Sequence, residues 1–415
     1  MTAPGAVVIG GYANGVSALR SLARAGVRTA VVLTKVHDIA HHSRYAHESH
    51  RVMDLHRRPD GLIDLLQDQG KAWRGWALIP TNDYALTALA EHRELLSRWY
   101  PPTVPTADVV RQVVVKQRTY QAAQEVGVDV PLSYGPASRV TAQRQDIVYP
   151  VVVKPLQGAA FWERFAKKLF VVRSPLELIA AIDQVERAGI AAEVFDLVPG
   201  PDQNFYNYTV YLDQQGQPAA EFAFRKLRKA PPFFGVARAA EVADVPELRE
   251  PTIALLQRIG WRGIASAEYK RDPRDGRFRL MEINGRCYLS HALATRCGVN
   301  YPLLTWQEHA QRQRVKATRN GWRGVWLHLH ADLLYTAVQE RGPDWKWGDF
   351  IRTYTGPWID AVWSAADPTP FVAQWRGTLR KAAQEIRDGQ EMKEVRNRFQ
   401  AMPSSVPTPF TREIS

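Results

Sequence analysis

The sequence predicts an α/β protein in which a parallel-sheet domain precedes a module rich in antiparallel hairpins. Short apolar strands alternate with amphipathic helices over about the first hundred residues, a pattern typical of a parallel sheet. Two strand–turn–strand patterns follow, at 206–225 and 265–284. Eight of the 13 tryptophans lie beyond residue 305, so the C-terminal part differs in composition. We expect three segments: 1–106, 107–310 and a Trp-rich extension at 311–415.

The N-terminal segment opens with a strand and a glycine-rich turn, Gly10-Gly11-Tyr12-Ala13-Asn14-Gly15. The glycine spacing does not match the dinucleotide pattern GxGxxG, so a tight turn against a helix is the simpler interpretation, and an anion site remains the alternative. The expected elements are a strand at 6–9, a helix at 16–25, strands at 29–33 and 76–80, and a helix at 84–99.

Six of the 11 histidines lie between His37 and His56. Their spacing has no clear metal-ligand signature, so we expect an irregular loop rather than a metal site.

The middle segment repeats the alternation of strands and helices. Its expected elements are a helix at 107–127, strands at 147–155 and 170–172, a helix at 175–188, a strand at 191–195, a hairpin of 206–213 with 220–225, a helix at 246–260 and a hairpin of 265–270 with 277–284.

The last hairpin carries the strongest chemical signal. Residues 272–276 have the composition of a turn. If the turn is centred near Asp275, Glu268 lies opposite Glu282, and Asn284 points to the same face. Three oxygen ligands beside Arg286 would suit Mg²⁺ shared with phosphate oxygens. The alternative from spacing alone is a solvated hairpin face with unrelated carboxylates.

The run Met281-Glu282-Ile283-Asn284-Gly285-Arg286, with Glu268 14 residues before Glu282, resembles the metal-binding element E-x-N-x-R of the ATP-grasp superfamily. The resemblance covers about residues 1–310 and is greatest to the carboxylate–amine ligase branch, which includes D-aspartate ligase and relatives of carbamoyl-phosphate synthase. It implies a pre-ATP-grasp domain at 1–106 and an ATP-grasp module with lobe A at about 107–190 and lobe B at about 191–310.

The resemblance also implies a role for several further positions. These are ATP binding by Lys116 and Lys154, adenine recognition by the main chain of Glu193, Val194 and Phe195, ribose contact by Asp202, metal binding by Glu268, Glu282 and Asn284, and stabilisation of the transferring phosphoryl group by Lys226 and Arg286. Acyl-substrate contacts are implied, by family analogy alone, for Asn14, Ser43, Arg44, Asp83 and His291.

Two departures from the family pattern affect the loops. The segment 156–162 after Lys154 has one glycine where many ATP-grasp enzymes have a glycine-rich flap, so backbone amides with Lys167 or Lys168, or a mobile lid, would cover the phosphates. Gly285 stands where the family often has proline.

Two other residue types invite a chemical interpretation. Cys287 follows Arg286, but the sequence places no His or Asp partner beside it, so we expect a packed thiol rather than a nucleophile. The C-terminal aromatic residues suit core packing, with a wall of an acceptor pocket as the alternative.

The resemblance implies an ATP-dependent carboxylate–amine ligase that forms an amide through an acyl phosphate, with an amino acid or peptide as the expected substrate. The expected cofactors are ATP and Mg²⁺, with Mn²⁺ as a substitute, and the expected partners are small carboxylates and amines. Another ATP-grasp phosphotransferase or carboxylase-type enzyme is one alternative. A non-catalytic nucleotide- or nucleic-acid-binding protein is another, supported only by the net charge of +12.

Composition indicates which partners and which cellular compartment to expect. Basic residues are spread along the chain without a nucleic-acid motif, so we do not expect a nucleic-acid partner. Two cysteines suit a reducing compartment. No stretch approaches the ~20 apolar residues of a membrane span, and no signal-type N-terminus is present. We expect a cytoplasmic protein without membrane contact; homo-oligomerisation is left open.

Overall fold

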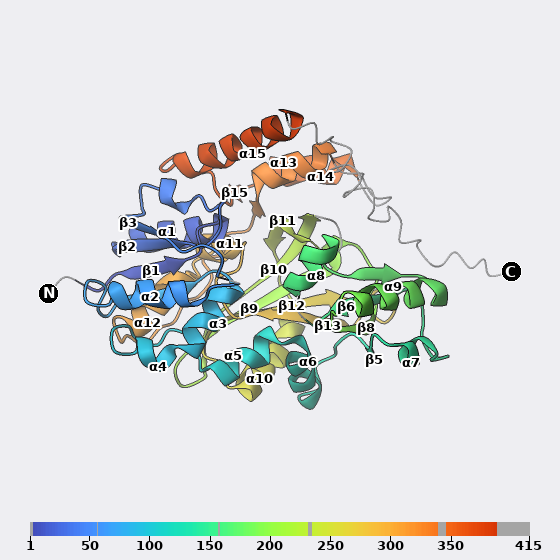
Figure 1. Cartoon of the computed structure of the whole chain (residues 1–415). Coiled ribbons are helices and arrows are strands. Elements are labelled where there is room, and N and C mark those ends of the chain that lie inside the picture. Colours follow the sequence, from blue (N-terminus) through green and yellow to red (C-terminus); the bar gives the residue numbers. More distant parts are fainter. Residues whose placement is uncertain (1–2, 56, 157, 231–234, 339–345, 388–415) are drawn as a thin grey trace.

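The computed structural model describes residues 3–387 of the 415-residue chain, except 56, 157, 231–234 and 339–345. The described strands form a four-stranded parallel sheet, a four-stranded antiparallel sheet and a seven-stranded mixed sheet. Helices cover these sheets, and the three sheets follow one another along the chain (Figure 1). The predicted α/β architecture, with a parallel sheet first and antiparallel hairpins after it, is confirmed.

The N-terminal parallel sheet is built from short strands with helices between them. Its elements are β1 (Ala6–Ile9), α1 (Ala13–Arg24), β2 (Thr29–Leu33), η1 (Ala40–His42), β3 (Glu48–Arg51), α2 (Asp60–Asp68), β4 (Ala77–Pro80), α3 (Asp83–Glu91) and α4 (Arg93–Leu96). The strand order is β3-β2-β1-β4. Strands β1, β2 and β4 are buried along their whole length, as their apolar sequences predict.

The histidine-rich stretch from His37 to His56 is not the irregular loop that we predicted. It contains η1 and strand β3, and β3 pairs with β2 at the edge of the sheet. Its side chains are alternately half-buried and exposed, so the strand lacks the apolar run by which a buried strand is found. No group of three or more His, Cys, Asp and Glu side chains suited to a metal occurs in the described part of the chain.

The glycine-rich turn between β1 and α1 is filled by the protein itself. A Cβ atom at Gly10 would lie 2.2 Å from Thr81 Oγ1, and one at Gly15 would lie 2.1 Å from the carbonyl oxygen of Gly10. Glycine is therefore required for close packing of the helix on the sheet. This close packing explains why the turn contains glycines, and no bound dinucleotide is needed to explain them.

The middle segment begins with two helices where we predicted one. They are α5 (Ala107–Val114) and α6 (Lys116–Glu125). The break occurs at Val115, whose backbone is extended (φ −95°, ψ 104°). The break makes Lys116 the first residue of α6.

Lobe A contains the smaller antiparallel sheet, in the strand order β5-β8-β6-β7. Its elements are β5 (Ser133–Pro136), α7 (Arg139–Ala142), β6 (Val151–Pro155), α8 (Gly158–Phe165), β7 (Phe170–Val172), α9 (Pro175–Arg187) and β8 (Ala192–Asp196). Because β8 pairs with β5 and β6, this sheet extends beyond residue 190, the approximate limit that we predicted for lobe A.

Lobe B is organised around the seven-stranded sheet, in the order β13-β12-β9-β10-β11-β14-β15. Its elements up to residue 310 are η2 (Asp202–Asn204), β9 (Phe205–Leu212), β10 (Pro218–Ala230), β11 (Val236–Val242), η3 (Pro246–Leu248), α10 (Arg249–Ile259), β12 (Gly263–Arg271), β13 (Phe278–Asn284), α11 (His291–Arg296) and α12 (Tyr301–His309). Both predicted hairpins are present, as β9 with β10 and β12 with β13.

The Trp-rich C-terminal segment continues the lobe B sheet. Its described elements are β14 (Val325–Leu327), α13 (Leu329–Val338), α14 (Trp347–Thr355), β15 (Trp358–Asp360) and α15 (Thr369–Arg387). β14 pairs with β11, and β15 pairs with β14. Figure 1 shows α13, α14 and α15 along one side of the molecule, beside both β11 and the N-terminal sheet. Trp326 is fully buried, as expected for a packing residue, whereas Trp345 lies outside the described residues.

Two buried aspartates attach this C-terminal segment to the rest of the fold. Asp367 accepts hydrogen bonds from Arg20 Nε (2.9 Å) and Ser43 Oγ (2.6 Å) in the N-terminal domain. Asp332 pairs with two arginines of lobe B: Arg228 Nη2 lies 2.7 Å from Asp332 Oδ2, and Arg238 Nε lies 3.3 Å from Oδ1.

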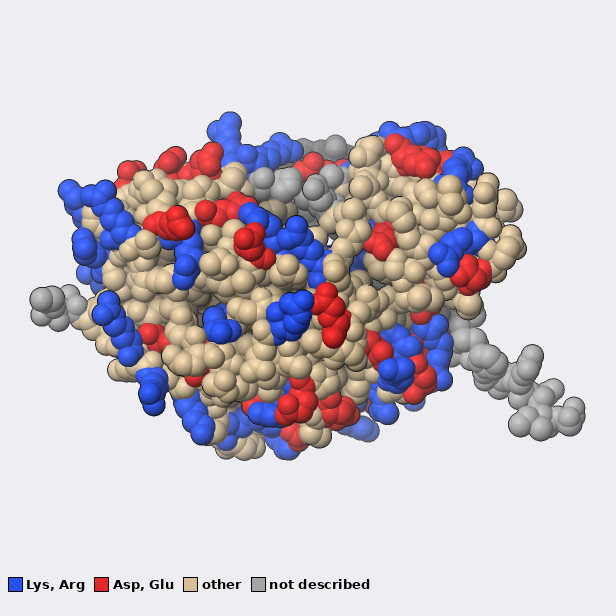
Figure 2. All heavy atoms as spheres, turned by 90° about the horizontal axis from the view of Figure 1, so that it is seen from below, with Lys and Arg blue, Asp and Glu red and all other residues tan. Residues whose placement is uncertain are grey.

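Charged side chains of both signs share the surface. On the face in Figure 2, Lys and Arg lie in small groups with Asp and Glu between them. The absence of a nucleic-acid partner stays a prediction. None of the helices in the described residues combines the length and apolar character that a membrane span requires.

Asp332→Asn is predicted to destabilise the fold by about 3–5 kcal/mol, because it leaves two buried guanidinium groups without a charged partner. The free energy of unfolding in urea measures the effect. Asp244→Asn is the matched control, because Asp244 also pairs with two arginines but its side chain is 51% exposed. The control should change the unfolding free energy by less than about 1 kcal/mol. Equal effects of the two substitutions would contradict the assigned role of Asp332.

Candidate active site

The candidate site is built on the hairpin of β12 and β13, whose register determines which side chains share a face. Glu268 pairs with Glu282, and Ser266 pairs with Asn284. Directly opposed residues of antiparallel strands project to the same side. Both carboxylates and the Asn284 amide therefore lie on one face, and the predicted register is confirmed. Metal binding by these side chains stays a prediction.

Each carboxylate is paired with a lysine from another element. Lys116 Nζ, at the start of α6, lies 3.1 Å from Glu282 Oε2. Lys226 on β10 forms an ion pair with Glu268, and both side chains are almost fully buried. Lys116 holds the pKa of Glu282 well below its usual range, against the opposite effect of burial. Burial has the largest single effect on the Lys116 pKa and lowers it. Glu282, Tyr120 and the hydrogen bond with Lys154 together outweigh burial, so the net shift of the pKa is upward.

Lys154 lies on β6 beside this cluster. Its Nζ is 5.9 Å from the centre of the Tyr120 ring, and its pKa is lowered well below normal by burial and then by the charge of Lys116. Val152, two residues earlier on the same face of the strand, packs with Tyr120 and Phe195 in a small apolar cluster. These three side chains are almost fully buried, and they lie beside the ammonium groups of Lys116 and Lys154.

The main chain of the predicted adenine-binding residues is not available for a ligand. β8 lies between β5 and β6, and Val194 pairs with Gly135 on one side and Val153 on the other. Its side chain is buried in the lobe A core. The Glu193 carboxylate accepts hydrogen bonds from Ser133 and Gln117. A central strand has no free main-chain edge, and adenine recognition by the main chain of Glu193, Val194 and Phe195 stays a prediction.

Two contacts fix the end of β8 and the segment after it to lobe B. Lys270 Nζ donates to the carbonyl oxygen of Val198 (2.8 Å). Arg274 donates through Nη1 to Asp196 Oδ1 (3.1 Å), and through Nη2 to the other oxygen, and it also contacts the buried Asp272. The sequence interpretation missed Asp196. The acidic position of the pattern E-x-I-P-G-x-D, counted back from Pro199, falls on this residue and could have identified it.

Three lysine ammonium groups surround the ring of Phe205 at the start of β9. Their Nζ atoms lie 3.6 Å (Lys229), 4.9 Å (Lys270) and 5.4 Å (Lys226) from the ring centre. Burial lowers the pKa of Lys229 to about 7 and that of Lys270 to about 8. Asp202, the predicted ribose contact, accepts a hydrogen bond from the Lys229 amide (2.8 Å). Lys270 was missed although strand parity places it on the face of Glu268.

Arg286 connects the hairpin to the N-terminal domain. Its Nε donates to Asp83 Oδ1 (2.7 Å), and its Nη2 donates to Asp83 Oδ2 (3.2 Å) and to Asn284 Oδ1 (2.9 Å). Asn284 Nδ2 in turn reaches Glu282 Oε1 at 3.4 Å. The structure thus brings Asp83, Arg286 and the predicted metal ligands into one continuous group.

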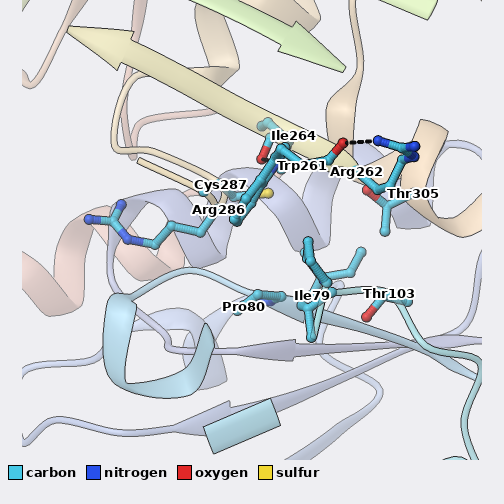
Figure 3. A pocket seen from close by; sticks show the side chains of 12 residues that line it. Ile79, Pro80, Thr103, Trp261, Arg262, Ile264, Arg286, Cys287 and Thr305 are labelled. Carbon is cyan, nitrogen blue, oxygen red and sulfur yellow. Dashed lines mark hydrogen bonds between the residues drawn. The ribbon is translucent and has the colours of Figure 1, made fainter. Parts of the chain in front are cut away.

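A small cavity lies behind this group, between the N-terminal domain and lobe B (Figure 3). It is lined by β4, the 103–105 segment, Trp261 and the 285–287 loop, and the Arg286 side chain extends away from it. Its volume of about 20 Å³ leaves room for about one water molecule. This cavity is too small for a nucleotide or an amino acid.

Four of the five predicted substrate residues have their polar groups engaged elsewhere. Asn14 Nδ2 donates to the carbonyl oxygens of Thr81 (2.8 Å) and Cys287 (3.0 Å). His291 Nε2 lies 3.0 Å from the Asn14 carbonyl oxygen, and burial lowers the pKa of this histidine to about 4. Ser43 and the Arg44 amide bind Asp367. Substrate contact by these four residues stays a prediction, and only Asp83 adjoins the predicted catalytic groups.

Of the two lysines considered for phosphate cover, Lys168 is affected by the charges of the two carboxylates. Desolvation has the largest effect and lowers the Lys168 pKa, and the charges of Glu282 and Glu268 oppose this shift without reversing it. Lys167 instead lies over the Phe170 ring, 5.7 Å from its centre.

Comparisons with known proteins show which proteins this chain is similar to. The family model of the carbamoyl-phosphate synthase L chain, ATP-binding domain, matches residues 237–311. The chain has the ATP-grasp fold, and its residues 237–311 are similar to the ATP-binding domain of that superfamily. It is 24% identical to D-aspartate ligase from Enterococcus faecium (strain Aus0004) over 239 residues, which is 54% of this chain and 56% of that protein.

Solved structures show the same fold at low identity. N5-carboxyaminoimidazole synthetase from Staphylococcus aureus superposes with a TM-score of 0.62 at 14% identity, over 80% of this chain and 85% of that one. L-amino acid ligase from Bacillus licheniformis superposes with a TM-score of 0.57 at 16% identity, over 77% and 76%. These similarities establish the predicted ATP-grasp fold and leave the substrates undetermined.

The two cysteine thiols are predicted to be inert in the folded protein. Burial raises the pKa of Cys287 to about 12 and also raises that of Cys297, and both thiols are buried, so neither presents an accessible thiolate. Ellman's reagent should react with neither thiol before unfolding and with both in guanidinium. Rapid labelling of one thiol in the folded protein would revive the interpretation of Cys287 as a nucleophile.

Proposed function

We propose that this chain is an ATP-dependent carboxylate–amine ligase that forms an amide through an acyl phosphate. The observation that carries the proposal is the opposed pair Glu268 and Glu282, each held by a lysine from another element. Lys154 and the apolar cluster of Tyr120, Val152 and Phe195 adjoin this pair. Such a group can bind the charged end of a nucleotide with its cation and the apolar base beside it.

The donor set fits a hard divalent cation. Two carboxylates and an amide oxygen on one sheet face match the preference of Mg²⁺ and Mn²⁺ for oxygen ligands. Glu268, Glu282 and Asn284 would hold the cation, which would neutralise charge on the phosphate oxygens. Lys116 and Lys226 neutralise the two carboxylates in the structure. A bound cation would take over this neutralisation, and the two lysines could then pair with the phosphates instead.

The proposed reaction has two steps. A substrate carboxylate oxygen attacks the γ-phosphorus of ATP, the bond to the β-phosphate oxygen breaks, and ADP leaves. The amine nitrogen then attacks the acyl carbon, loses a proton and displaces inorganic phosphate. Arg286 and Lys226 stabilise the negative charge during transfer. Asp83 holds the Arg286 guanidinium through both of its oxygens and so fixes its direction.

The identity of the substrates is a separate part of the proposal. The similarity to D-aspartate ligase and L-amino acid ligase favours an amino acid or a peptide. The similarity to N5-carboxyaminoimidazole synthetase keeps a carboxylase-type reaction as the second candidate. Phosphate release from ATP, screened with amino acids, dipeptides and bicarbonate and followed by mass analysis, separates the two. A bicarbonate-dependent product would replace the ligase assignment.

Glu282→Gln is predicted to abolish the Mg²⁺-dependent rise of the melting temperature with ATP and to lower ATP turnover at least about 100-fold. The substitution preserves shape and removes the charge that the cation requires. Melting curves with ATP, with and without Mg²⁺, measure this directly and need no second substrate.

Asp275→Asn is the matched control, because Asp275 is a carboxylate at the turn of the same hairpin and pairs with Arg279. It should retain the full Mg²⁺-dependent shift. If the unaltered chain gains no stability from Mg-ATP, or if Glu282→Gln keeps the whole gain, the proposed site is wrong.

A further inference from the structure

The row of oxygen-bearing side chains on the lobe B sheet extends one strand beyond the predicted metal ligands. Glu282 on β13 pairs with Glu268 on β12, and Glu268 pairs with Asn207 on β9. Opposed residues in neighbouring antiparallel strands project to the same face, with Cβ atoms about 4.5–5.5 Å apart. Asn207 is therefore the next side chain after Glu268 in the row.

Asn207 has a buried oxygen atom without a partner. The residue is 3% exposed, and its Oδ1 accepts no hydrogen bond from the described residues. Its Nδ2 donates to Ser266 Oγ at 3.3 Å, and Ser266 is fully buried and bonded to Thr209. The amide nitrogen is thus directed toward Ser266, and the oxygen is the group left for a ligand on this face.

An unpaired buried oxygen has an energetic cost of about 1–3 kcal/mol. Native proteins rarely accept this cost unless water, an ion or a ligand completes the group. The residues around Asn207 indicate whether water, an ion or another ligand completes its oxygen. The neighbour on one side is the carboxylate of Glu268, and the neighbour on the other side is the apolar ring of Phe224. Carboxylate and amide oxygens side by side suit a divalent cation, and Lys226 neutralises the Glu268 carboxylate in the structure.

We propose that Asn207 is an additional oxygen donor of the cation site, contacting the cation directly or through one of its bound waters. The predicted set then has four members, Glu268, Glu282, Asn284 and Asn207, drawn from three adjacent strands. This inference rests on the proposed function, because it needs the cation to bind at Glu268 and Glu282. It adds a ligand that the E-x-N-x-R element does not contain.

The test measures Mn²⁺ binding rather than turnover. Electron paramagnetic resonance of free Mn²⁺, titrated with protein saturated with a non-hydrolysable ATP analogue, gives the dissociation constant of the cation. Asn207→Ala is expected to weaken Mn²⁺ binding about tenfold, in the range found for supporting metal-site groups. Thr209→Val is the matched control, because Thr209 lies on the same face of β9, one row away, and should leave the dissociation constant within about twofold.

Asn207→Asp provides a second variant that keeps the size of the side chain. The added charge should lower the melting temperature without metal, through repulsion from Glu268, and should enlarge the rise in melting temperature that Mn²⁺ produces. Unchanged Mn²⁺ affinity in folded Asn207→Ala, or no larger Mn²⁺-induced rise in Asn207→Asp, would overturn the inference alone.

Failure of the proposed function would give a different result from failure of the Asn207 inference. If the unaltered chain with bound analogue takes up no Mn²⁺, both the cation site and the role of Asn207 are wrong. If the unaltered chain binds Mn²⁺ and Glu282→Gln does not, the proposed site stands, and the Asn207 variants decide the inference.

Discussion

Two carboxylates face each other across neighbouring strands of the lobe B sheet, and like charges in this position destabilise a sheet unless something neutralises them. Glu268 and Glu282 are neutralised by Lys226 and Lys116, which come from different elements. Lys226 reaches the pair along β10, and Lys116 reaches it because the helical run of residues 107–125 breaks at Val115. The register of one hairpin thus decides which lysines gather beside the two carboxylates. Lys154 adds a further positive charge that burial makes unfavourable and that a phosphate chain would stabilise.

The remaining contacts hold this group between three parts of the chain. The N-terminal domain contributes Asp83, which fixes Arg286, and lobe A is fixed to the β12–β13 turn through Asp196 and Arg274. The C-terminal segment contacts both lobe B and the N-terminal domain. Its strands extend the lobe B sheet, and its buried aspartates bind arginines of lobe B and of the N-terminal domain. The C-terminal segment, whose role the sequence did not reveal, therefore joins the parts of the fold that hold the predicted catalytic groups.

Local pattern and residue parity predicted much of this site. The pairing of Glu268 with Glu282 follows from the turn composition and the period of two along a strand, and both are short-range properties. The same parity rule places Lys270 beside Glu268, although it was not applied there. Other features depend on long-range pairing. β14 and β15 are three-residue strands whose partners are far away in the sequence, and β3 is a polar edge strand. The bonding of Ser43 with Asp367, and the central position of β8, become visible only once distant segments are assembled.

The central claim is that Lys116 and a divalent cation compete for the Glu282 carboxylate. Mn²⁺ binding to the nucleotide-free Lys116→Met variant, followed by electron paramagnetic resonance, tests this competition most directly. Removing the ammonium group frees the carboxylate, so nucleotide-free Mn²⁺ affinity should rise about tenfold, which corresponds to ~1.4 kcal/mol. The affinity for the ATP analogue should fall in the same variant, because a phosphate partner is lost. Mn²⁺ affinity that is unchanged or lower in Lys116→Met would contradict the account.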